Sequence, residues 1–245
     1  MVIVPRPPGP VIAQDQTPTK PAAPARATLS EPLTAHPYWI QRDIENQIAL
    51  LLGARSDILF LGDSITDFLE RGDGKQLWDA LYAPLGAINF GIGGARTSHV
   101  LWQIESGQVA IAAPKVVVLL IGSNNLAENE PPAEVAAGVE RIITEIRVRL
   151  PDTRVLLLGI LPRGSAADAP LREPITETNQ LLAELADDDR VVYLDIGGYF
   201  VDPGGALWPV LMPDGLHPNN WGYFVYTVAI WDKLMGLLIL AERQP

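Results

Sequence analysis

Three side chains of this chain have the types and the spacing that acyl transfer uses. Ser64 comes shortly after the apolar run Ile58–Leu61, and a serine hydroxyl becomes a nucleophile when an adjacent base takes its proton. His217 is the candidate base. Asp214, three residues earlier, could accept a hydrogen bond from its imidazole and stabilise the imidazolium that forms. The three residues together predict the catalytic group of a serine hydrolase.

Gly94 and Asn124 are the candidate donors to an oxyanion. A tetrahedral intermediate needs preorganised N–H groups about 3 Å from its developing negative charge. Gly94 lets the backbone approach a substrate closely, and Asn124 offers a side-chain amide. The backbone N–H of Ser64 is a further candidate if this serine begins a helix, because such N–H groups bind anions.

Each of these motifs also has a purely structural interpretation. Ser64 and Asp67 fit a helix capping box, with the serine at the N-cap and the aspartate three residues later. The Gly-rich stretch before Ala95 fits an ordinary loop, Asn124 fits a turn, and the Asp214/His217 spacing is common. The sharp turn with a glycine two residues after the serine is absent.

Composition narrows the chemistry. The 245 residues contain no cysteine, which excludes a cysteine nucleophile and a thiolate metal site. The net charge of −11 disfavours nucleic acid as a partner, since phosphate binding needs clustered Lys and Arg. Only three histidines are available, and His36 lies in a Pro-rich tail while His99 falls within an amphipathic helix. The base is therefore expected to be His217.

The elements that must position these residues alternate along the chain. Buried strands are expected at Ile58–Leu61, Ala87–Phe90, Val116–Ile121, Val155–Leu158 and Val191–Leu194. Helical spacing is found at Tyr38–Leu52 (apolar Ile40, Ile44, Ile48, Leu51 and Leu52), Leu77–Leu81, Ser98–Ile104, Ala133–Leu150 and Ile175–Ala186. Such alternation predicts an α/β fold with a parallel sheet between two helix layers. Ligands of such sheets bind at the carboxyl ends of the strands, where the candidate residues lie.

The two ends of the chain differ from this pattern. Residues 1–37 hold nine of the 22 prolines and lack apolar periodicity, so they are expected to form an extended or disordered leader before a single domain at 38–245. The leader does not contain a complete secretory signal, because Pro5 interrupts the apolar start; the compartment, cytoplasmic or exported, stays open. The C-terminal helix, Asn219 to about Ala241, is apolar over a membrane-spanning length. Asp232 and Lys233 near its middle favour a buried or interface helix over a transmembrane one.

The four blocks around Ser64, Gly94, Asn124 and His217 resemble those of the SGNH or GDSL hydrolases, which are named for these residues. The resemblance covers about residues 55–240. Within the family, the chain resembles the branch that contains the catalytic α subunits of intracellular platelet-activating-factor acetylhydrolase. The segments that carry this likeness are Asn89–Gly94, His99–Trp102 and Leu161–Gly164.

The resemblance implies a flavodoxin-like fold with five parallel strands, no metal or other cofactor, and an oxyanion hole formed by the Ser64 N–H, the Gly94 N–H and the Asn124 side chain. It also implies a site for short acyl chains. The apolar segment Leu207–Met212 departs from the branch and adds bulk near the expected site.

We therefore expect a serine esterase that acts on short-chain acyl esters through an acyl-serine intermediate. Its partner would be a small-molecule ester, and the apolar end Leu237–Leu240 hints at a homodimer. Two alternatives use the same fold: a carbohydrate O-deacetylase, and a binding or assembly subunit without turnover. A metal-dependent phosphoesterase built on Asp63, Asp67 and Asp73 is disfavoured because no histidine or further carboxylate cluster completes a metal site.

Overall fold

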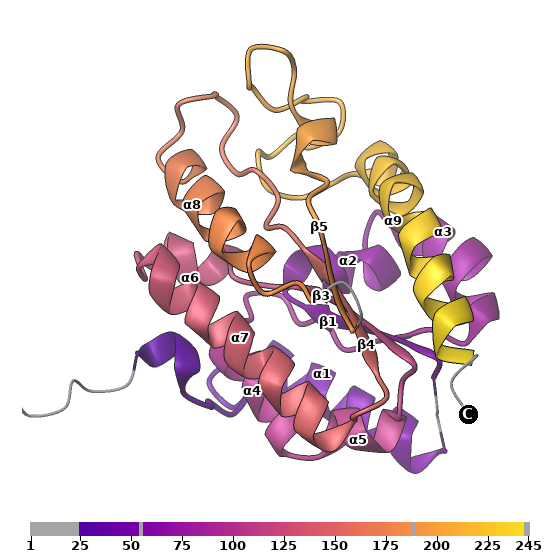
Figure 1. Ribbon diagram of the computed structural model, residues 1–245. Coiled ribbons are helices and arrows are strands. Elements are labelled where there is room, and N and C mark those ends of the chain that lie inside the picture. The colour runs from indigo at the N-terminus through magenta and orange to yellow at the C-terminus, as the bar shows by residue number, and fades with distance from the viewer. Residues whose placement is uncertain (1–24, 54–55, 188–189, 243–245) are drawn as a thin grey trace, which may run out of the picture.

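The computed structural model describes residues 25–53, 56–187 and 190–242, and these contain a five-stranded, wholly parallel sheet (Figure 1). The strand order is β2-β1-β3-β4-β5. The strands are β1 (Ile58–Gly62), β2 (Ile88–Asn89), β3 (Val116–Leu120), β4 (Arg154–Leu158) and β5 (Val191–Leu194). Each expected strand is present, and β2 is shorter than expected.

Helices cover both faces of the sheet, which confirms the expected three-layer α/β/α fold. They are α1 (Pro37–Leu51), α2 (Ser64–Arg71), α3 (Lys75–Leu77), α4 (Thr97–Glu105), α5 (Gln108–Ala112), α6 (Ser123–Ala127), α7 (Pro132–Arg149), α8 (Arg172–Ala183) and α9 (Asn220–Glu242). Shorter turns are η1 (Arg26–Thr28), η2 (Trp78–Tyr82), η3 (Ala83–Leu85) and η4 (Gly197–Phe200).

Alternating strand residues divide the core into two clusters. Leu59 of β1 and Val117 of β3 pack with apolar residues of α1, α4, α5, α7 and α8. Ile58 and Val116, their neighbours along the same strands, pack with residues of α2 and α9 on the opposite face. Successive side chains of a strand point to opposite faces, so strands that are apolar throughout need a helix layer on each side.

The topology brings the candidate site residues to one edge of the sheet. β1 lies between β2 and β3, so the chain turns to one side after β1 and to the other after β2. The crevice at such a switch point is where open α/β sheets bind their ligands. Ser64, Gly94 and Asn124 follow β1, β2 and β3 in turn.

The apolar spacing that predicts α1 lies on its outer surface and not on its buried one. Ile44 and Ile48 are each 49% exposed and Leu51 is 85% exposed, whereas Arg42 and Asn46 are buried. The helix is confirmed, and the apolar positions that predicted it are not its buried positions. The reason is that the inner surface of α1 meets polar backbone and carboxylate groups, as described below.

The expected leader is packed where the structure describes it. Residues 1–24 lie outside the described residues. Ala27 and Leu33 are buried, and Thr97 of α4 donates a hydrogen bond to the Ala27 carbonyl at 2.9 Å. The backbone N–H of Glu31 also bonds the Ser98 carbonyl, at 3.1 Å. The packed region therefore begins before Pro37.

By length and composition α9 could cross a membrane, with a mean hydropathy of 1.7 over its most apolar window. In the fold, one side of this helix packs on the sheet. Tyr223, Tyr226, Ile230 and Leu234 are buried in the core cluster that includes β3 and β4. Burial of this side accounts for part of the composition, whereas Trp221, Phe224 and Val228 on the outer side are 66%, 50% and 60% exposed.

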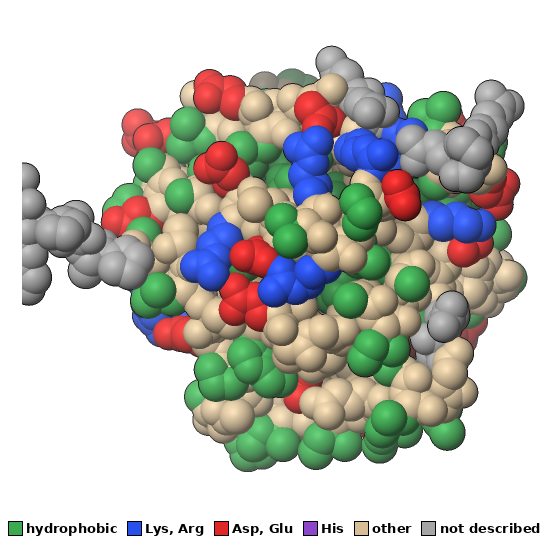
Figure 2. All heavy atoms as spheres, turned by 60° about the horizontal axis from the view of Figure 1, so that its bottom comes forward, with side chains coloured by type: hydrophobic (Ala, Val, Ile, Leu, Met, Phe, Trp, Pro, Cys, Tyr) green, Lys and Arg blue, Asp and Glu red, His purple; other side chains and the backbone are tan. Residues whose placement is uncertain are grey.

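Charged side chains of opposite sign lie next to one another on the face shown in Figure 2. Ion pairs such as Arg147 with Asp187 at 2.7 Å and Arg141 with Glu105 at 2.8 Å join side chains of opposite sign in the same way. Phosphate backbones bind where Lys and Arg are clustered without such partners. The arrangement on this face is unlike a nucleic-acid surface.

Candidate active site

Ser64 is the first residue of α2, and Asp63 before it is the N-cap. The Asp63 carboxylate accepts a hydrogen bond from the backbone N–H of Ile65 at 3.0 Å. The expected capping box with Ser64 at the N-cap was therefore wrong by one residue. Because Asp63 takes the capping role, the Ser64 hydroxyl is free to contact another group.

The turn from β1 into α2 is tight, and it requires a glycine. A Cβ atom on Gly62 would lie 2.3 Å from the Leu120 carbonyl oxygen of β3 and 2.2 Å from the Thr66 hydroxyl. Both distances are far below van der Waals contact. Gly62 therefore lets α2 begin directly at the carboxyl end of β1 and places Ser64 beside the switch point.

Ser64, His217 and Asp214 form one hydrogen-bonded chain. The Ser64 Oγ lies 3.0 Å from His217 Nε2, and His217 Nδ1 lies 2.7 Å from Asp214 Oδ2. Ser64 and His217 are 153 residues apart in the sequence. The fold thus brings all three predicted residues together in the geometry of a nucleophile, a base and an orienting carboxylate.

The Asp214 carboxylate is held by its own loop. Its Oδ1 accepts from the backbone N–H groups of Leu216 at 2.9 Å and His217 at 2.7 Å. Partial burial opposes ionisation of Asp214, but hydrogen bonds from the His217 backbone and imidazole outweigh it and lower the pKa of this carboxyl. The group therefore stays ionised at neutral pH and suits the support of an imidazolium.

Two further groups surround the imidazole and the serine. The ring of Phe68, one turn into α2, lies against His217 with ring centroids 5.1 Å apart. Asp63 is fully buried below the serine, and this burial raises the pKa of its carboxyl to about 6, against the opposing effects of the Ile65 N–H and His217. Phe68 limits the ring's rotation, and Asp63 fixes the start of α2.

Gly94 and Asn124 lie next to each other across the edge of the sheet. Asn124 is in α6, and its side-chain amide donates to the carbonyl of Ala95, the residue after Gly94, at 2.9 Å. Gly94 has a φ of +79°, in the left-handed region that glycine adopts at little cost. The two candidate donors therefore lie in adjoining segments, Gly94 in the loop after β2 and Asn124 in α6.

Asn125 has a structural role that sequence reasoning missed. It is fully buried, it accepts from the Thr97 N–H at 3.1 Å, and its amide donates to the Thr97 hydroxyl at 3.0 Å. These bonds hold the start of α4 against α6. The two adjacent asparagines in the sequence indicated a polar contact here. Which of them faces the Gly94 loop depends on where α6 begins, because neighbouring residues of a helix point in different directions.

The other two histidines lie where they support α1 and α4. His36 is the N-cap of α1 and accepts from the Tyr38 N–H at 3.1 Å, so it is not part of a loose tail. His99 is buried and accepts from the Arg96 N–H at 3.0 Å. Burial, together with the charge of Arg96, lowers the pKa of His99 to about 4.

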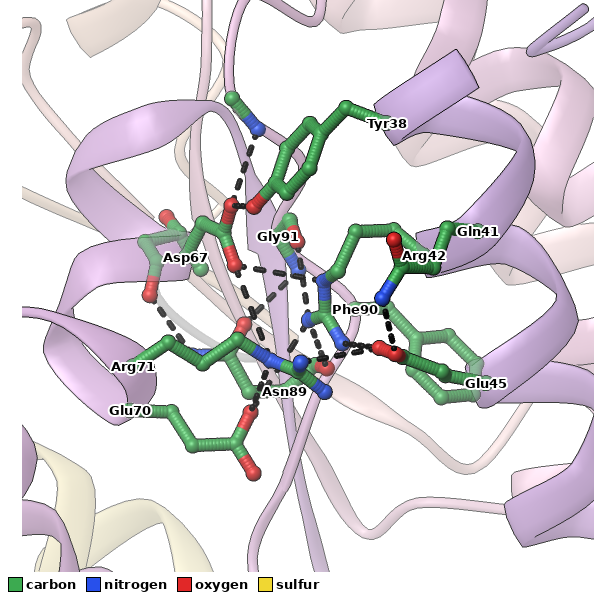
Figure 3. Close-up of polar contacts among 12 residues, drawn as sticks. Tyr38, Gln41, Arg42, Glu45, Asp67, Glu70, Arg71, Asn89, Phe90 and Gly91 are labelled. Atoms are coloured by element: carbon green, nitrogen blue, oxygen red, sulfur yellow. Dashed lines mark hydrogen bonds and ion pairs between the residues drawn. The ribbon is translucent and has the colours of Figure 1, made fainter.

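Asp63 and Asp67, two of the carboxylates considered for a metal-dependent phosphoesterase, have different structural roles. Asp63 caps α2, whereas Asp67 is buried among donors, where it pairs with Arg42 Nε at 3.3 Å and accepts from the Tyr38 hydroxyl and the Gly93 N–H. Figure 3 shows Tyr38 and Arg42 both directed at Asp67. Sequence reasoning assigned Asp67 to a cap and gave Tyr38 and Arg42 no role.

Comparison with known proteins adds to this geometry. The sequence profile of the GDSL-like lipase/acylhydrolase family matches residues 60–224. The chain belongs to this family. Members are carboxylic ester hydrolases, and the matched range contains the whole of the Ser64–His217–Asp214 chain.

Curated relatives of this acylhydrolase include platelet-activating factor acetylhydrolase IB subunits. The rat alpha2 subunit is 39% identical over 183 residues, which cover 74% of this chain and 77% of the relative. The human alpha1 subunit is 37% identical over 189 residues, covering 77% and 79%. The expected family and branch are therefore confirmed.

Solved structures agree on the fold. One from Streptococcus pneumonia, named for platelet activating factor, has a TM-score of 0.67 at 26% identity and covers 80% of this chain and 92% of its own. Axe2, an acetylxylan esterase from Geobacillus stearothermophilus, has a TM-score of 0.60 at 20% identity and covers 74% and 95%. The second likeness concerns the fold alone.

Proposed function

We propose that this GDSL acylhydrolase is a serine esterase that cleaves short-chain, acetyl-type esters through an acyl-serine intermediate. Ser64 is the nucleophile, His217 the general base and acid, and Asp214 the group that orients the imidazole. The observation that carries the proposal is the continuous chain of contacts, 3.0 Å from Ser64 to His217 and 2.7 Å from His217 to Asp214.

Acylation begins when His217 Nε2 takes the hydroxyl proton of Ser64 and the Ser64 Oγ attacks the ester carbonyl. The carbonyl oxygen becomes an oxyanion, which the N–H groups of Ser64 and Gly94 and the Asn124 amide stabilise. The imidazolium then gives its proton to the leaving alcohol, and the carbon–oxygen bond to that alcohol breaks. Asp214 stabilises the imidazolium in the interval.

Deacylation repeats these steps with water. His217 takes a proton from water, and the resulting hydroxide attacks the acyl-serine carbonyl. The same three donors stabilise the second oxyanion. Collapse of this intermediate returns the proton to the Ser64 Oγ and releases the carboxylic acid, so atoms and protons balance over the cycle.

The preference for short acyl groups rests on the relatives, which are named acetylhydrolases. The residues of the apolar segment Leu207–Met212 differ in how far they are exposed. Leu207 and Met212 are buried in the core, whereas Trp208 and Val210 are 42% and 60% exposed. Pro209 between them is exposed as well and Leu211 is half-buried, so the middle of the segment is the part available to contact a substrate.

The test is hydrolysis of p-nitrophenyl esters from acetate to decanoate by the wild type and by Ser64→Ala. We expect kcat/KM to be highest for the shortest esters, and Ser64→Ala to lose about a thousandfold or more. Ser106→Ala is the matched control, because Ser106 caps the end of α4 away from the Gly94 loop and bonds only its own helix at 3.1 Å.

Near-full activity in Ser64→Ala would overturn the assignment of the nucleophile. Acetate release from acetylated xylan that exceeds release from p-nitrophenyl acetate would instead identify a carbohydrate O-deacetylase with the same residues. Absence of turnover on every ester would favour a binding subunit that keeps the fold.

A further inference from the structure

Trp39 of α1 contacts the peptide group that supplies one of the proposed oxyanion donors. Its indole Nε1–H donates to the carbonyl oxygen of Gly93 at 2.7 Å. That carbonyl and the N–H of Gly94 belong to the same planar peptide unit. In a trans peptide the two point in opposite directions, so a bond that holds the carbonyl also sets the direction of the N–H.

The preceding peptide unit is held as well, from the other side. The N–H of Gly93 donates to Asp67 Oδ2 at 3.1 Å. Asp67 is fully buried, accepts from the Tyr38 hydroxyl, and pairs with Arg42 at 3.3 Å. Burial and the neighbouring Asp67 carboxylate raise the pKa of Tyr38, so its hydroxyl keeps its proton and continues to donate.

Arg42 extends this support to the start of the loop. Its guanidinium is buried and donates to the carbonyls of Asn89 at 3.2 Å and Gly91 at 3.1 Å. Figure 3 shows the contacts of the Arg42 guanidinium with Asp67 and with the backbone of Asn89 and Gly91. The polar inner side of α1 thus spans the segment from the end of β2 to Gly93.

The loop needs such support because it is rich in glycine. Gly91, Gly93 and Gly94 have no side chains with which to anchor themselves, and glycine has more backbone freedom than any other residue. Gly94 also lies against the indole ring, since a Cβ built on it would be 3.5 Å from Cζ2 of Trp39. The ring itself packs on His99, with ring centroids 4.5 Å apart.

We propose that Trp39 is a positioning residue of the oxyanion hole, which aims the Gly94 N–H through its bond to the Gly93 carbonyl. The Tyr38–Asp67–Arg42 cluster fixes the preceding peptide for the same purpose. The inference rests on the proposed function, in which the Gly94 N–H stabilises the oxyanion. A donor that is already oriented costs no reorganisation when the charge develops, so the effect belongs to the transition state.

The experiment compares Trp39→Phe with the wild type on p-nitrophenyl acetate. Phenylalanine keeps an aromatic ring against His99 and removes the N–H donor. Because the oxyanion forms only in the transition state, we expect kcat to fall about ten- to a hundredfold while KM changes by less than about twofold. The inhibition constant of a trifluoromethyl ketone, which mimics the tetrahedral adduct, should rise by the same factor as kcat/KM falls.

Trp102→Phe is the matched control, because Trp102 packs against the same core cluster from α4. We expect its kcat to equal that of the wild type. If Trp39→Phe does not fold, Tyr38→Phe tests the same proposal through Asp67, and we expect a smaller loss of kcat with unchanged KM. Unfolding temperatures of all variants show which of them are folded.

The outcomes separate this proposal from the proposed function. If Ser64→Ala is inactive while folded Trp39→Phe keeps kcat within about twofold, Trp39 has no positioning role and the nucleophile stands. A rise in KM alone would likewise overturn the proposal, because Trp39 would then act on ground-state binding. Activity in Ser64→Ala would instead remove the proposed function on which the inference rests.

Discussion

The two halves of the active site are held in different ways. In the acid–base half, Asp214 to His217, the Asp214 side chain bonds residues two or three positions away, and one backbone bond, from the Gly164 N–H to the Gly215 carbonyl at 2.8 Å, reaches the loop from elsewhere. The oxyanion half, the loop that ends at Gly94, is stabilised by side chains 26 and 54 positions away. Asp214 has a half-exposed carboxylate, whereas Asp67 on the other half is fully buried.

Because of this difference, we expect residues of the acid–base half to be replaced with little effect on the stability of the fold, and residues that support the oxyanion half to be replaced only at a cost in stability. The Asp214 side chain is positioned by hydrogen bonds from within its own loop. A glycine loop that depends on buried ionic groups of another helix links catalytic geometry to stability. Substitutions in the acid–base half should therefore lower activity with little change in stability. Substitutions in the oxyanion half should lower both.

The largest expected effect is on activity in the acid–base half. His217→Ala removes the base, and we expect kcat on p-nitrophenyl acetate to fall by about a thousandfold or more. The free energy of unfolding should change by less than about 1 kcal/mol, because the imidazole is partly exposed and lies outside both core clusters. Steady-state kinetics and urea unfolding check both numbers. A loss of activity below tenfold would contradict the assigned role.

Arg42→Met should have its main effect on stability. It removes the buried cation nearest to the Asp67 carboxylate and leaves only the more exposed Arg71, at 4.0 Å, and breaking a buried ion pair in this way costs about 3–5 kcal/mol. Gln41→Met is the control on the exposed side of the same helix, where we expect a change within about 0.5 kcal/mol. Equal urea midpoints for the two variants would show that the oxyanion half does not depend on this pair.

The smallest expected effect is a pH dependence from the buried support of the oxyanion half. The pKa of His99 is lowered to about 4, whereas a histidine in the unfolded chain has a pKa of about 6.5. Between these values the unfolded chain binds more protons, so His99 makes stability fall as the pH drops from about 6.5 to 4.

Asp63 has the opposite sign. Its pKa is raised to about 6, so the stability it contributes is present at low pH and is lost as the pH rises through about 6. The comparison of wild type with His99→Asn isolates the histidine, since Asp63 is common to both. Urea midpoints at pH 7 and pH 5 should differ less in the variant, and an unchanged difference would contradict the low pKa.

Sequence patterns predicted the features that depend on residues close together in the chain. The strands, the long helices and the three-layer fold followed from apolar runs and their alternation, and Ser64, Asp214 and His217 followed from side-chain chemistry after the strands. The scarcity of histidine was the most useful count, because it left His217 as the candidate base before any resemblance was considered.

The remainder depends on tertiary contacts that no local pattern displays. The apolar residues of α1, such as Ile44 and Ile48, predicted the helix, but Arg42 and Asn46 are the buried residues. Their burial is possible because backbone carbonyls and Asp67 supply partners for Arg42, and these come from distant segments. The cap at Asp63 was missed because two neighbouring residues could both cap α2.

The central claim is that Ser64 is the nucleophile, and active-site labelling tests it most directly. The wild-type chain is treated with a fluorophosphonate, which reacts with an activated serine, and the inactivated protein is analysed by tandem mass spectrometry of its peptides. We predict one phosphonyl adduct, on Ser64, formed in proportion to the loss of esterase activity and absent in His217→Ala. Inactivation with the adduct on another residue, or full activity after Ser64 is labelled, would contradict the account.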